Sequence, residues 1–364
     1  MNSIITRFAP SPTGNLHIGG IRTALINYIV TQKIKKDGKK AKFLLRIEDT
    51  DKKRSTNQYK KNIIDGLNWL NLKHDEKTHL QSDYINRHKE VAYELMKNNK
   101  AFKCICTQDE LEHRRNENKK LSKNIKRLCS KCENNNEIQS LEKGFVVRIS
   151  ISSQGATSIN DIIQGNITIK NNEIDNFILL RKDGSPTYML SVVVDDFDMG
   201  VNLIIRGDDH LNNAFRQIFI YKNMNWQIPK YAHIPLIHGE DGKKLSKRHG
   251  AVNINEFKSK GYIKEGIINN LILLGWAPPN ENEIISIENI INSFDLNKIS
   301  KSSSIFDYKK LNYFNNYYIK NDKNLKELFN YCNINEKLKD YLSIDKNKFI
   351  RIFEAYKEKL NFYE

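Results

Sequence analysis

Long apolar runs are absent from this chain of 364 residues. Its mean hydropathy is −0.61, and no stretch approaches the roughly 20 consecutive apolar residues that a membrane-spanning helix needs. A signal peptide is missing too, and no repeat with a period of about 20–50 residues is apparent. These absences exclude an integral membrane protein and a repeat array, and we expect a cytoplasmic protein.

Acidic residues are fewer than basic residues in this chain. The chain has 59 Lys and Arg against 43 Asp and Glu, which gives a formal charge of +16 and a pI near 9.4. Such a balance favours a polyanionic partner, whose phosphates would be contacted in a salt-dependent way. The alternative is that the abundance of Lys, Asn and Ile reflects an AT-rich genome, so charge by itself does not identify a partner.

Cysteine is also scarce, yet four of the five cysteines fall in one region. Cys104 and Cys106 form one close pair and Cys129 and Cys132 another, with 22 residues between the pairs. This spacing, in polar surroundings, predicts one structural zinc per chain, bound by four thiolates that fold a segment with few apolar residues. The alternative is four ordinary thiols. Disulfides are not expected in a reducing compartment.

The N-terminal residues predict a strand, a turn and a helix. Residues 4–6 are apolar and β-branched, a Pro- and Gly-rich turn follows, and apolar residues recur at helical spacing over 18–29. A second strand is predicted over 42–47. Together these make a βαβ unit with a ligand crevice at the carboxyl ends of its strands.

The turn places His17 at the start of the predicted helix. An imidazole and free backbone N–H groups at the positive end of a helix dipole suit a phosphate, and Gly19 and Gly20 let a planar base approach the backbone. The alternative is a strand-to-helix turn with an incidental histidine.

A second charged segment, residues 239–250, is bracketed by glycines. Its Lys244 and Lys247, separated by Leu-Ser, could close over a nucleoside triphosphate and stabilise charge on the α-phosphate and on the leaving pyrophosphate. The alternative is a solvated surface turn.

Together with residues 7–20, five ordered segments resemble the class I aminoacyl-tRNA synthetases, specifically the bacterial glutamate–tRNA ligases with a shortened C-terminal region. The five segments are 46–51, 186–188, 194–196, 205–210 and 244–251. The resemblance extends from Arg7 to about Ile319. Gly20 stands where many class I enzymes have a second histidine, which leaves His17 as the single imidazole of the signature.

The resemblance implies an α/β fold with a Rossmann-type catalytic domain in two halves. Its five regions are the first catalytic half (1–103), an inserted acceptor-stem-binding subdomain with the cysteines (104–188), the second catalytic half with the lysine loop (189–255), an α-helical stem-contact region (256–320) and a remnant of the anticodon-binding region (321–364).

The implied reaction is the ATP-dependent activation of L-glutamate to glutamyl-adenylate, with Mg²⁺, followed by transfer to the 3′-terminal adenosine of tRNA(Glu). A monomer is expected. Two alternatives stay open: a reduced or inactive tRNA-binding paralogue, and an enzyme that also glutamylates tRNA(Gln).

The resemblance also implies site residues. His17, Lys244 and Lys247 are the predicted catalytic residues. Predicted ATP contacts are Pro10, Ser11, His17, Gly19, Gly20, Lys244, Ser246 and Lys247. Predicted contacts to glutamate are Arg7, Ala9, Ser11, Glu48, Tyr188, Val192, Arg206 and His210.

Carboxylate chemistry explains part of that assignment. Arg7 and Arg206 can each form two parallel hydrogen bonds with a carboxylate, and Glu48 can accept from the ammonium group. The alternative for each arginine is an internal ion pair. Asp195 and Asp196 are expected to order a strand end by hydrogen bonds, with metal binding as the alternative.

Overall fold

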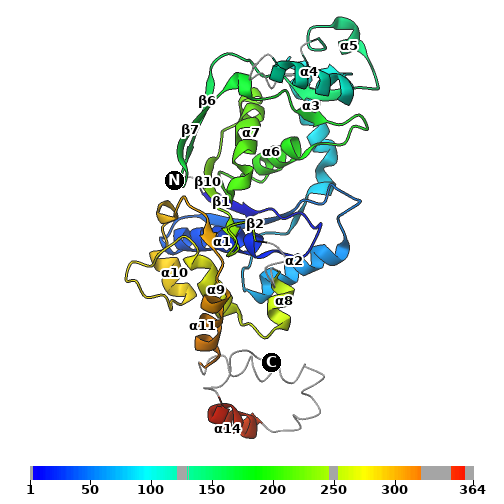
Figure 1. Cartoon of the computed structure of the whole chain (residues 1–364). Helices are drawn as coiled ribbons and strands as arrows, with labels where there is room; N and C mark the ends of the chain where they lie inside the picture. Colours follow the sequence, from blue (N-terminus) through cyan, green and yellow to red (C-terminus); the bar gives the residue numbers. More distant parts are fainter. Residues whose placement is uncertain (1–2, 121–128, 130, 246–252, 321–345, 357–364) are drawn as a thin grey trace. The chain divides into compact units, whose positions relative to one another are not determined.

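The computed structural model describes residues 3–120, 129, 131–245, 253–320 and 346–356 (Figure 1). The chain divides into two compact units. The first unit is Met1–Ala9, Leu44–Asp51 and Glu76–Ile234, and the second unit is Pro10–Phe43, Lys52–Asp75 and Pro235–Glu364. Each unit is therefore built from separate stretches of the sequence.

Two neighbouring sheets dominate the first unit. One has the strand order β1-β2-β3 and the other the order β7-β6-β10-β9. Their strands are β1 (Ile4–Phe8), β2 (Ala41–Ile47, which begins in the second unit), β3 (His79–Leu80), β6 (Ala156–Asp161), β7 (Gly165–Lys170), β9 (Leu203–Gly207) and β10 (Lys230–Ile234). Asn202, just before β9, donates its backbone N–H to the carbonyl of Ile5 in β1. The edges of the two sheets thus meet at β1 and β9.

Parallel pairing confirms the predicted α/β class. Strand β10 runs parallel to β9 and, at its pairing of Tyr231 with Asp161, parallel to β6. Strand β2 runs parallel to β3. The strands predicted over 4–6 and 42–47 are β1 and β2, which are neighbours in their sheet. Strand β9 has four consecutive buried residues, as is typical of a parallel strand that is covered on both faces.

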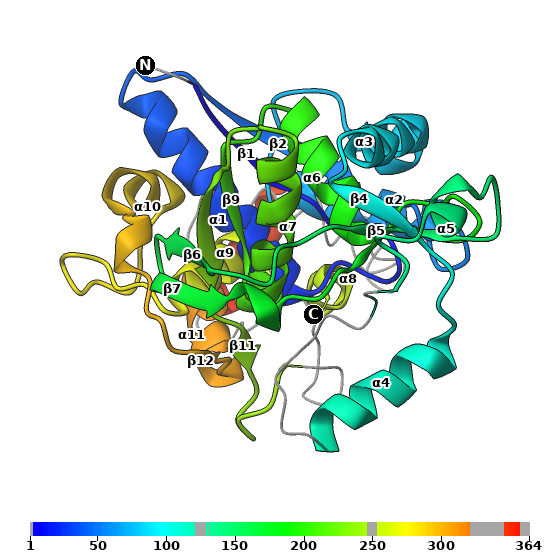
Figure 2. The same cartoon turned by 90° about the horizontal axis from the view of Figure 1, so that it is seen from above.

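Helices pack against the sheet β7-β6-β10-β9 and against one another. Within the first unit, α7 packs against β6 and α6 packs against both α7 and α3 (Figure 2). These helices are α3 (Ile85–Lys97), α6 (Tyr188–Asp198) and α7 (Leu211–Asn223), and the short 3₁₀ helices η1 (Gln81–Tyr84), η2 (Asn171–Glu173) and η3 (Asp208–His210) lie in the same unit. Buried side chains from α6, α7 and the strands, such as Val193, Phe215 and Ile204, form its core.

A smaller antiparallel sheet, in the order β4-β5-β8, completes the first unit. Its elements are β4 (Ala101–Cys104), α4 (Gln108–Lys120), α5 (Asn136–Ser140), β5 (Val146–Ile149) and β8 (Ile178–Leu180). Strand β4 ends at Cys104, so the first cysteine pair, Cys104 and Cys106, lies at the end of a strand.

The second unit is mainly helical. Its elements are α1 (Ile18–Lys36), α2 (Asn57–Trp69), β11 (Ile237–His238), α8 (Ile254–Ser259), α9 (Lys264–Leu273), α10 (Ile287–Ser293), η5 (Leu296–Lys298), β12 (Ser304–Ile305), α11 (Tyr308–Ile319) and α14 (Lys346–Tyr356). The helix predicted over 18–29 is α1. Helix α9 packs against α11, and Asn315 of α11 accepts a hydrogen bond from the backbone N–H of Ile263 at the start of α9.

The expected strand end at Asp195 and Asp196 is wrong. Both residues lie within helix α6 and are buried. Residues 190–196 are buried throughout, because helix α6 packs against α3 and α7. Such a buried segment carries no periodic pattern that distinguishes a strand from a helix.

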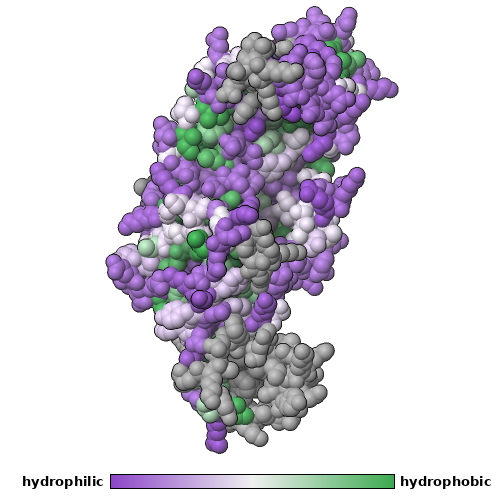
Figure 3. All heavy atoms as spheres, in the orientation of Figure 1, coloured by the Kyte–Doolittle hydropathy of each residue, from purple (hydrophilic) through white to green (hydrophobic). Residues whose placement is uncertain are grey.

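No helix in the described part of the chain is long and apolar enough to cross a membrane. In the view of Figure 3, hydrophilic residues cover most of the visible coloured surface and apolar residues form scattered patches.

The contact between α9 and α11 yields a test of packing. A Cβ atom added at Gly266 would lie 3.0 Å from the Cα and 3.1 Å from the backbone N of Asn315. We expect Gly266→Ala to displace α11 and to lower the free energy of unfolding by about 1–2 kcal/mol, after the helix propensity gained by alanine is subtracted. Urea unfolding measures this. Gly14→Ala is the control, because nothing lies within 4 Å of its added Cβ; equal stability of both variants would contradict the prediction.

Candidate functional site

The second unit contains the N-terminus of α1, which begins after His17. His17 has extended backbone angles and its Nδ1 accepts a hydrogen bond from the backbone N–H of Gly19 at 3.3 Å. Burial, followed by the nearby charge of Lys244, lowers the pKa of His17. The ring is therefore neutral at neutral pH and carries its proton on Nε2.

The first turn of α1 has no acidic residue. A Cβ atom added at Gly19 would contact only the His17 ring, at 3.7 Å. Packing within the described part of the chain therefore does not require glycine here, which fits a ligand that approaches this backbone. The N–H groups of a helix's first turn have no partner within the helix, so such a turn suits an anionic group such as phosphate.

The lysine segment begins as a hairpin. Leu245 donates its backbone N–H to the carbonyl of Ile237, and Gly239 donates to the carbonyl of Lys243. Gly242 closes the turn with a φ of +70°, which favours glycine. Leu245 is buried, so the hairpin fixes the backbone next to Lys244.

Residues that follow the lysine segment in the sequence pair with the histidine turn. His17 and Asn253 form an isolated antiparallel bridge, and Ile254 donates its backbone N–H to the carbonyl of Leu16. The two sequence signatures are thus joined in one unit. Ser246 and Lys247 lie outside the described residues. Gly20 lies in the first turn of α1; Pro10 and Ser11 also belong to this unit, and Ser11 is exposed.

The first unit contains a buried cluster of charges. Asp196 accepts hydrogen bonds from Nε of Arg7 at 2.9 Å and from Nη1 of Arg46 at 2.5 Å, and Nη2 of Arg7 lies 3.3 Å from its second oxygen. All three side chains are buried. Burial raises the pKa of Asp196, but the two guanidinium groups outweigh it, so the carboxylate stays ionised. The alternative considered for Arg7, an internal ion pair, is therefore present.

Two more acids join this cluster through Arg46. Its Nη2 donates to Oε1 of Glu48 at 3.0 Å, and its Nε lies 3.7 Å from Asp195. Burial raises the pKa of Glu48, and Arg46 only partly offsets it. Asp195 is also bonded to His88 at 2.6 Å and to Gln81 at 2.7 Å. Both aspartates thus hold protein groups in place.

Arg206 is the second predicted carboxylate ligand, and its surroundings differ. It is buried; Nε donates to Nε2 of His233 at 3.1 Å and Nη2 donates to the carbonyl of His210 at 3.2 Å. Its Nη1 is buried and has no hydrogen-bond partner among the described residues. A carboxylate oxygen would supply the missing acceptor.

Tyr188 and His210 lie beside one another. The Tyr188 hydroxyl is 3.2 Å from Nδ1 of His210. Burial raises the pKa of Tyr188, and burial followed by the charge of Arg206 lowers the pKa of His210. The remaining predicted residues of this unit are the buried Val192 in α6 and the half-buried Ala9.

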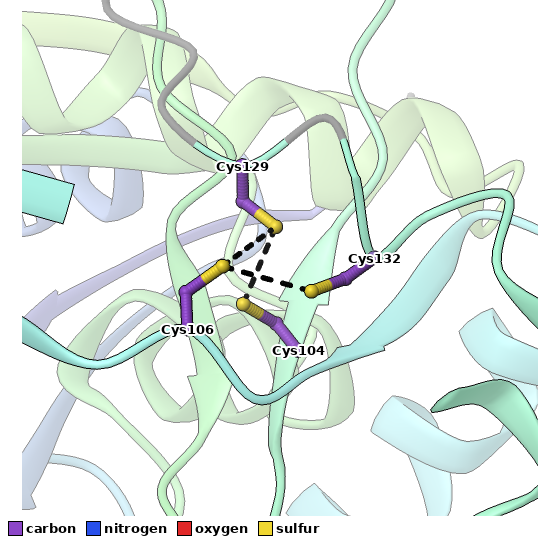
Figure 4. A group of neighbouring side chains, drawn as sticks. All are labelled: Cys104, Cys106, Cys129 and Cys132. Carbon is purple, nitrogen blue, oxygen red and sulfur yellow. Dashed lines mark hydrogen bonds between the residues drawn. The ribbon is translucent and has the colours of Figure 1, made fainter. Parts of the chain in front are cut away.

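Four cysteine sulfurs form a compact group in the first unit (Figure 4). Sγ of Cys129 lies 3.4 Å from that of Cys104 and 3.5 Å from that of Cys106, and Cys132 lies 3.6 Å from Cys106. All four sulfurs are within 4.8 Å of one another. Zinc–sulfur bonds of about 2.3 Å in a tetrahedron place sulfurs about 3.8 Å apart, so this set fits a tetrahedral metal.

Cations lie near these sulfurs. Nη1 of Arg114 is 3.8 Å from Sγ of Cys106. A hydrogen bond from Cys129, with help from Arg148, lowers the pKa of Cys104 to about 5. The apolar neighbours are few, with Phe102 and parts of Leu111, Ile138 and Val146 packed on the sulfurs. A bound metal would therefore contribute much of the stability of this segment.

Sequence reasoning missed several residues that hold the site. Arg46, His88 and Gln81 support Asp195 and Asp196, and Asp161 and His233 lie behind Arg206. Only Arg46 carried a signal, because it directly precedes Ile47 and Glu48 in a segment already noted. The others are far apart in the sequence and have no diagnostic spacing.

Comparisons with known proteins agree with this geometry. Residues 3–313 match the family described as "tRNA synthetases class I (E and Q), catalytic domain". The chain is 49% identical over 330 residues to glutamate–tRNA ligase 2 of Zymomonas mobilis, covering 90% of this chain and 67% of that protein. It is 47% identical over 321 residues to glutamate–tRNA ligase 1 of Ehrlichia canis, covering 87% and 66%. The chain thus spans about two thirds of the length of these curated relatives.

Solved structures are similar over the whole chain. A crystal structure of a glutamate tRNA ligase from Elizabethkingia meningosepticum, in complex with its amino acid, matches with a TM-score of 0.84 and 28% identity, covering 100% of this chain and 78% of that one. Glutamate-tRNA synthetase of Elizabethkingia anophelis matches with a TM-score of 0.83 and 27% identity, covering 100% and 79%.

The buried cluster yields a stability prediction. We expect Arg46→Met to lower the free energy of unfolding by about 3–5 kcal/mol, because Asp196 and Glu48 remain buried but lose the guanidinium that both of them bond to. The control is Arg87→Met, which removes a similar two-point bond to Asp198 on the surface and should cost at most about 1 kcal/mol. Denaturant unfolding of both variants checks this, and a similar small loss for the two would show that the cluster is not the predicted constraint.

Proposed function

The chain belongs to the class I tRNA synthetases for glutamate and glutamine, and within them to the glutamate–tRNA ligases, and from this premise we propose that it activates L-glutamate with ATP and transfers the glutamyl group to the 3′-terminal adenosine of tRNA(Glu). The observation that carries the choice of amino acid is Arg206, a buried guanidinium whose Nη1 has no partner among the described residues.

The charged side chains of the first unit are complementary to the charges of glutamate. Arg206 is positioned by neutral groups, so its charge remains for a substrate carboxylate. Glu48 would accept from the ammonium group of the substrate. Tyr188 and His210 would complete the pocket, with Arg7 fixed at its edge by Asp196. A side chain without an acceptor oxygen would leave Nη1 of Arg206 buried and unpaired, which disfavours apolar amino acids. The amide oxygen of glutamine could accept from Nη1, but it lacks the negative charge that a buried guanidinium favours.

ATP fits the second unit. The N-terminal turn of α1 supplies backbone N–H groups, and Gly19 leaves room for the nucleotide. His17 would donate Nε2–H to a phosphate. Lys244, Ser246 and Lys247 are proposed to contact the triphosphate, which Mg²⁺ accompanies, and to stabilise the charge that develops as pyrophosphate leaves.

The reaction needs no covalent nucleophile from the protein. In the first step a carboxylate oxygen of glutamate bonds to the α-phosphorus and pyrophosphate leaves. In the second step a ribose hydroxyl of the tRNA attacks the acyl carbon and AMP leaves. The protein supplies alignment and fixed charge to both steps. The net charge of +16 supports contacts with the tRNA phosphates, and we propose that residues 104–188 hold the acceptor end.

We further propose that Cys104, Cys106, Cys129 and Cys132 hold one structural zinc. The metal would link Cys104 and Cys106, at the end of β4, to Cys129 and Cys132, which precede α5. No catalytic step is proposed to depend on it. The compact thiol set and the small apolar core around it support this assignment.

Charging tests the function. The chain should transfer labelled glutamate to a tRNA(Glu) transcript. Charging of a tRNA(Gln) transcript and of an anticodon-altered tRNA(Glu) transcript measures its specificity for tRNA.

Lys247→Ala should reduce glutamyl-adenylate formation by about a hundredfold or more while tRNA binding stays nearly unchanged, because the lysine is proposed to act on developing charge. Lys243→Ala is the matched control. A chain that binds tRNA but forms no adenylate would instead be a binding paralogue.

Metal content tests the zinc site. Freshly purified protein should contain about one zinc per chain by mass spectrometry of the metal. Changing Cys104 and Cys106 together to Ser should remove it and lower the thermal midpoint of unfolding. Cys332→Ser, which changes the cysteine outside the two pairs, should leave the zinc content unchanged. Protein that is fully folded and free of metal would refute the site.

A further inference from the structure

Three buried side chains form a chain of hydrogen bonds across strands β6, β10 and β9. Oδ2 of Asp161, at the end of β6, lies 2.6 Å from Nδ1 of His233 on β10. Nε2 of His233 lies 3.1 Å from Nε of Arg206 on β9, and these two residues are direct neighbours in the parallel pairing. Asp161 and His233 are both almost completely buried.

The partners fix the protonation state of His233. A guanidinium group has only donors, so Nε2 of His233 must accept from Arg206. The ring proton is then on Nδ1 and is donated to Asp161. Burial, and then the charge of Arg206, lower the pKa of His233 despite the nearby carboxylate, which keeps the ring neutral. His233 is thus held as the Nδ1–H tautomer.

Asp161 is itself held by the backbone. Its Oδ1 accepts from the N–H groups of Ile163 and Gln164, each at 2.9 Å, and the backbone N–H of His233 is shared between Oδ1, at 3.2 Å, and Oδ2, at 3.1 Å. The N–H groups of Ile163 and Gln164 bond to Oδ1 alone, so Oδ2 is the oxygen that is directed to the imidazole. The orientation of the carboxylate is therefore set by the turn that follows β6.

We propose that Asp161 and His233 are positioning residues that orient the guanidinium of Arg206 for the side-chain carboxylate of glutamate. Nε is engaged by His233 and Nη2 by the carbonyl of His210, so the plane of the guanidinium is fixed and Nη1 is left for the substrate. This inference rests on the proposed function for the identity of the substrate, but the tautomer of His233 does not.

An isosteric change separates positioning from simple packing. In Asp161→Asn we expect the amide oxygen to take the place of Oδ1, because that position accepts from the N–H groups of both Ile163 and Gln164. The amide NH₂ then faces Nδ1 of His233 and forces the proton to Nε2. The Nε2–H would oppose the Nε–H of Arg206, and two donors cannot bond. Removing the negative charge of a buried histidine partner thus reverses its tautomer, as in the serine protease triad.

We expect Asp161→Asn to raise the KM for glutamate on the order of tenfold or more, because a buried donor of Arg206 loses its acceptor. The KM for ATP should change little. Asp198→Asn is the matched control, since Asp198 accepts a 3.0 Å bond from Arg87 at the surface of the same unit and its change should leave both KM values unchanged. An unchanged KM for glutamate in Asp161→Asn would overturn the positioning role.

Histidine ¹⁵N signals give a readout that does not need activity. His233, assigned with the help of a His233→Gln variant, should show the neutral Nδ1–H pattern in the wild-type chain and the Nε2–H pattern in Asp161→Asn. A charged ring, or Nε2–H in the wild type, would overturn the inference even if the enzyme charges tRNA. A wild-type chain with Nδ1–H but no charging would count against the proposed function alone.

A second pair of variants covers the case in which Asp161→Asn does not fold. His233→Gln keeps a carbonyl oxygen that can reach Arg206, whereas His233→Asn keeps only a group near Asp161. The glutamine variant should retain a KM for glutamate closer to that of the wild type. If the asparagine variant is the better of the two, the contact with Arg206 is not what His233 supplies.

Discussion

The ion pairs of Asp196 are the constraint on which the proposed amino-acid site depends. One buried carboxylate accepts from Arg7 on β1 and from Arg46 on β2, so a helix residue ties two neighbouring strands together. Isolated charges at this depth are strongly disfavoured, and each is tolerated because the others are present. Glu48 and Asp195 share Arg46, so both take their position from the same cluster. The geometry of the site thus follows from pairing charges that could not be buried singly.

The two predicted carboxylate ligands are not equivalent. Nε and Nη2 of Arg7 face an aspartate, so much of its charge is already neutralised inside the protein. Arg206 contacts a neutral imidazole and a backbone carbonyl, and neither of them cancels its charge. A guanidinium whose direct acceptors are neutral is less neutralised than one that is paired directly with a carboxylate, so it attracts an anion more strongly. Arg206 is therefore the stronger candidate for the side-chain carboxylate, and Arg7 for the wall of the pocket.

The sequence predicted what depends on neighbours along the chain. Strands β1 and β2, helix α1, and the helix-capping position of His17 follow from local apolar spacing and turn residues. The cysteine cluster was also foreseeable, because two close pairs restrict which thiols can meet. The helix at Asp195 and Asp196 was missed because its residues are buried on all sides. The contact between Asp161 and His233 joins residues whose separation has no periodic signal; it exists because β6 and β10 are neighbours in the sheet.

Both candidate sites use histidine in the same physical way. The Nδ1 of His17 accepts from a backbone N–H, and the Nε2 of His233 accepts from an arginine, so each ring is neutral with its proton on a defined nitrogen. Burial lowers the pKa of both rings. Charge is supplied instead by arginine and lysine, which stay protonated over the whole neutral range. Orientation and charge thus come from different side chains, so the proposed site can keep its hydrogen-bond geometry without depending on a group that titrates near neutral pH.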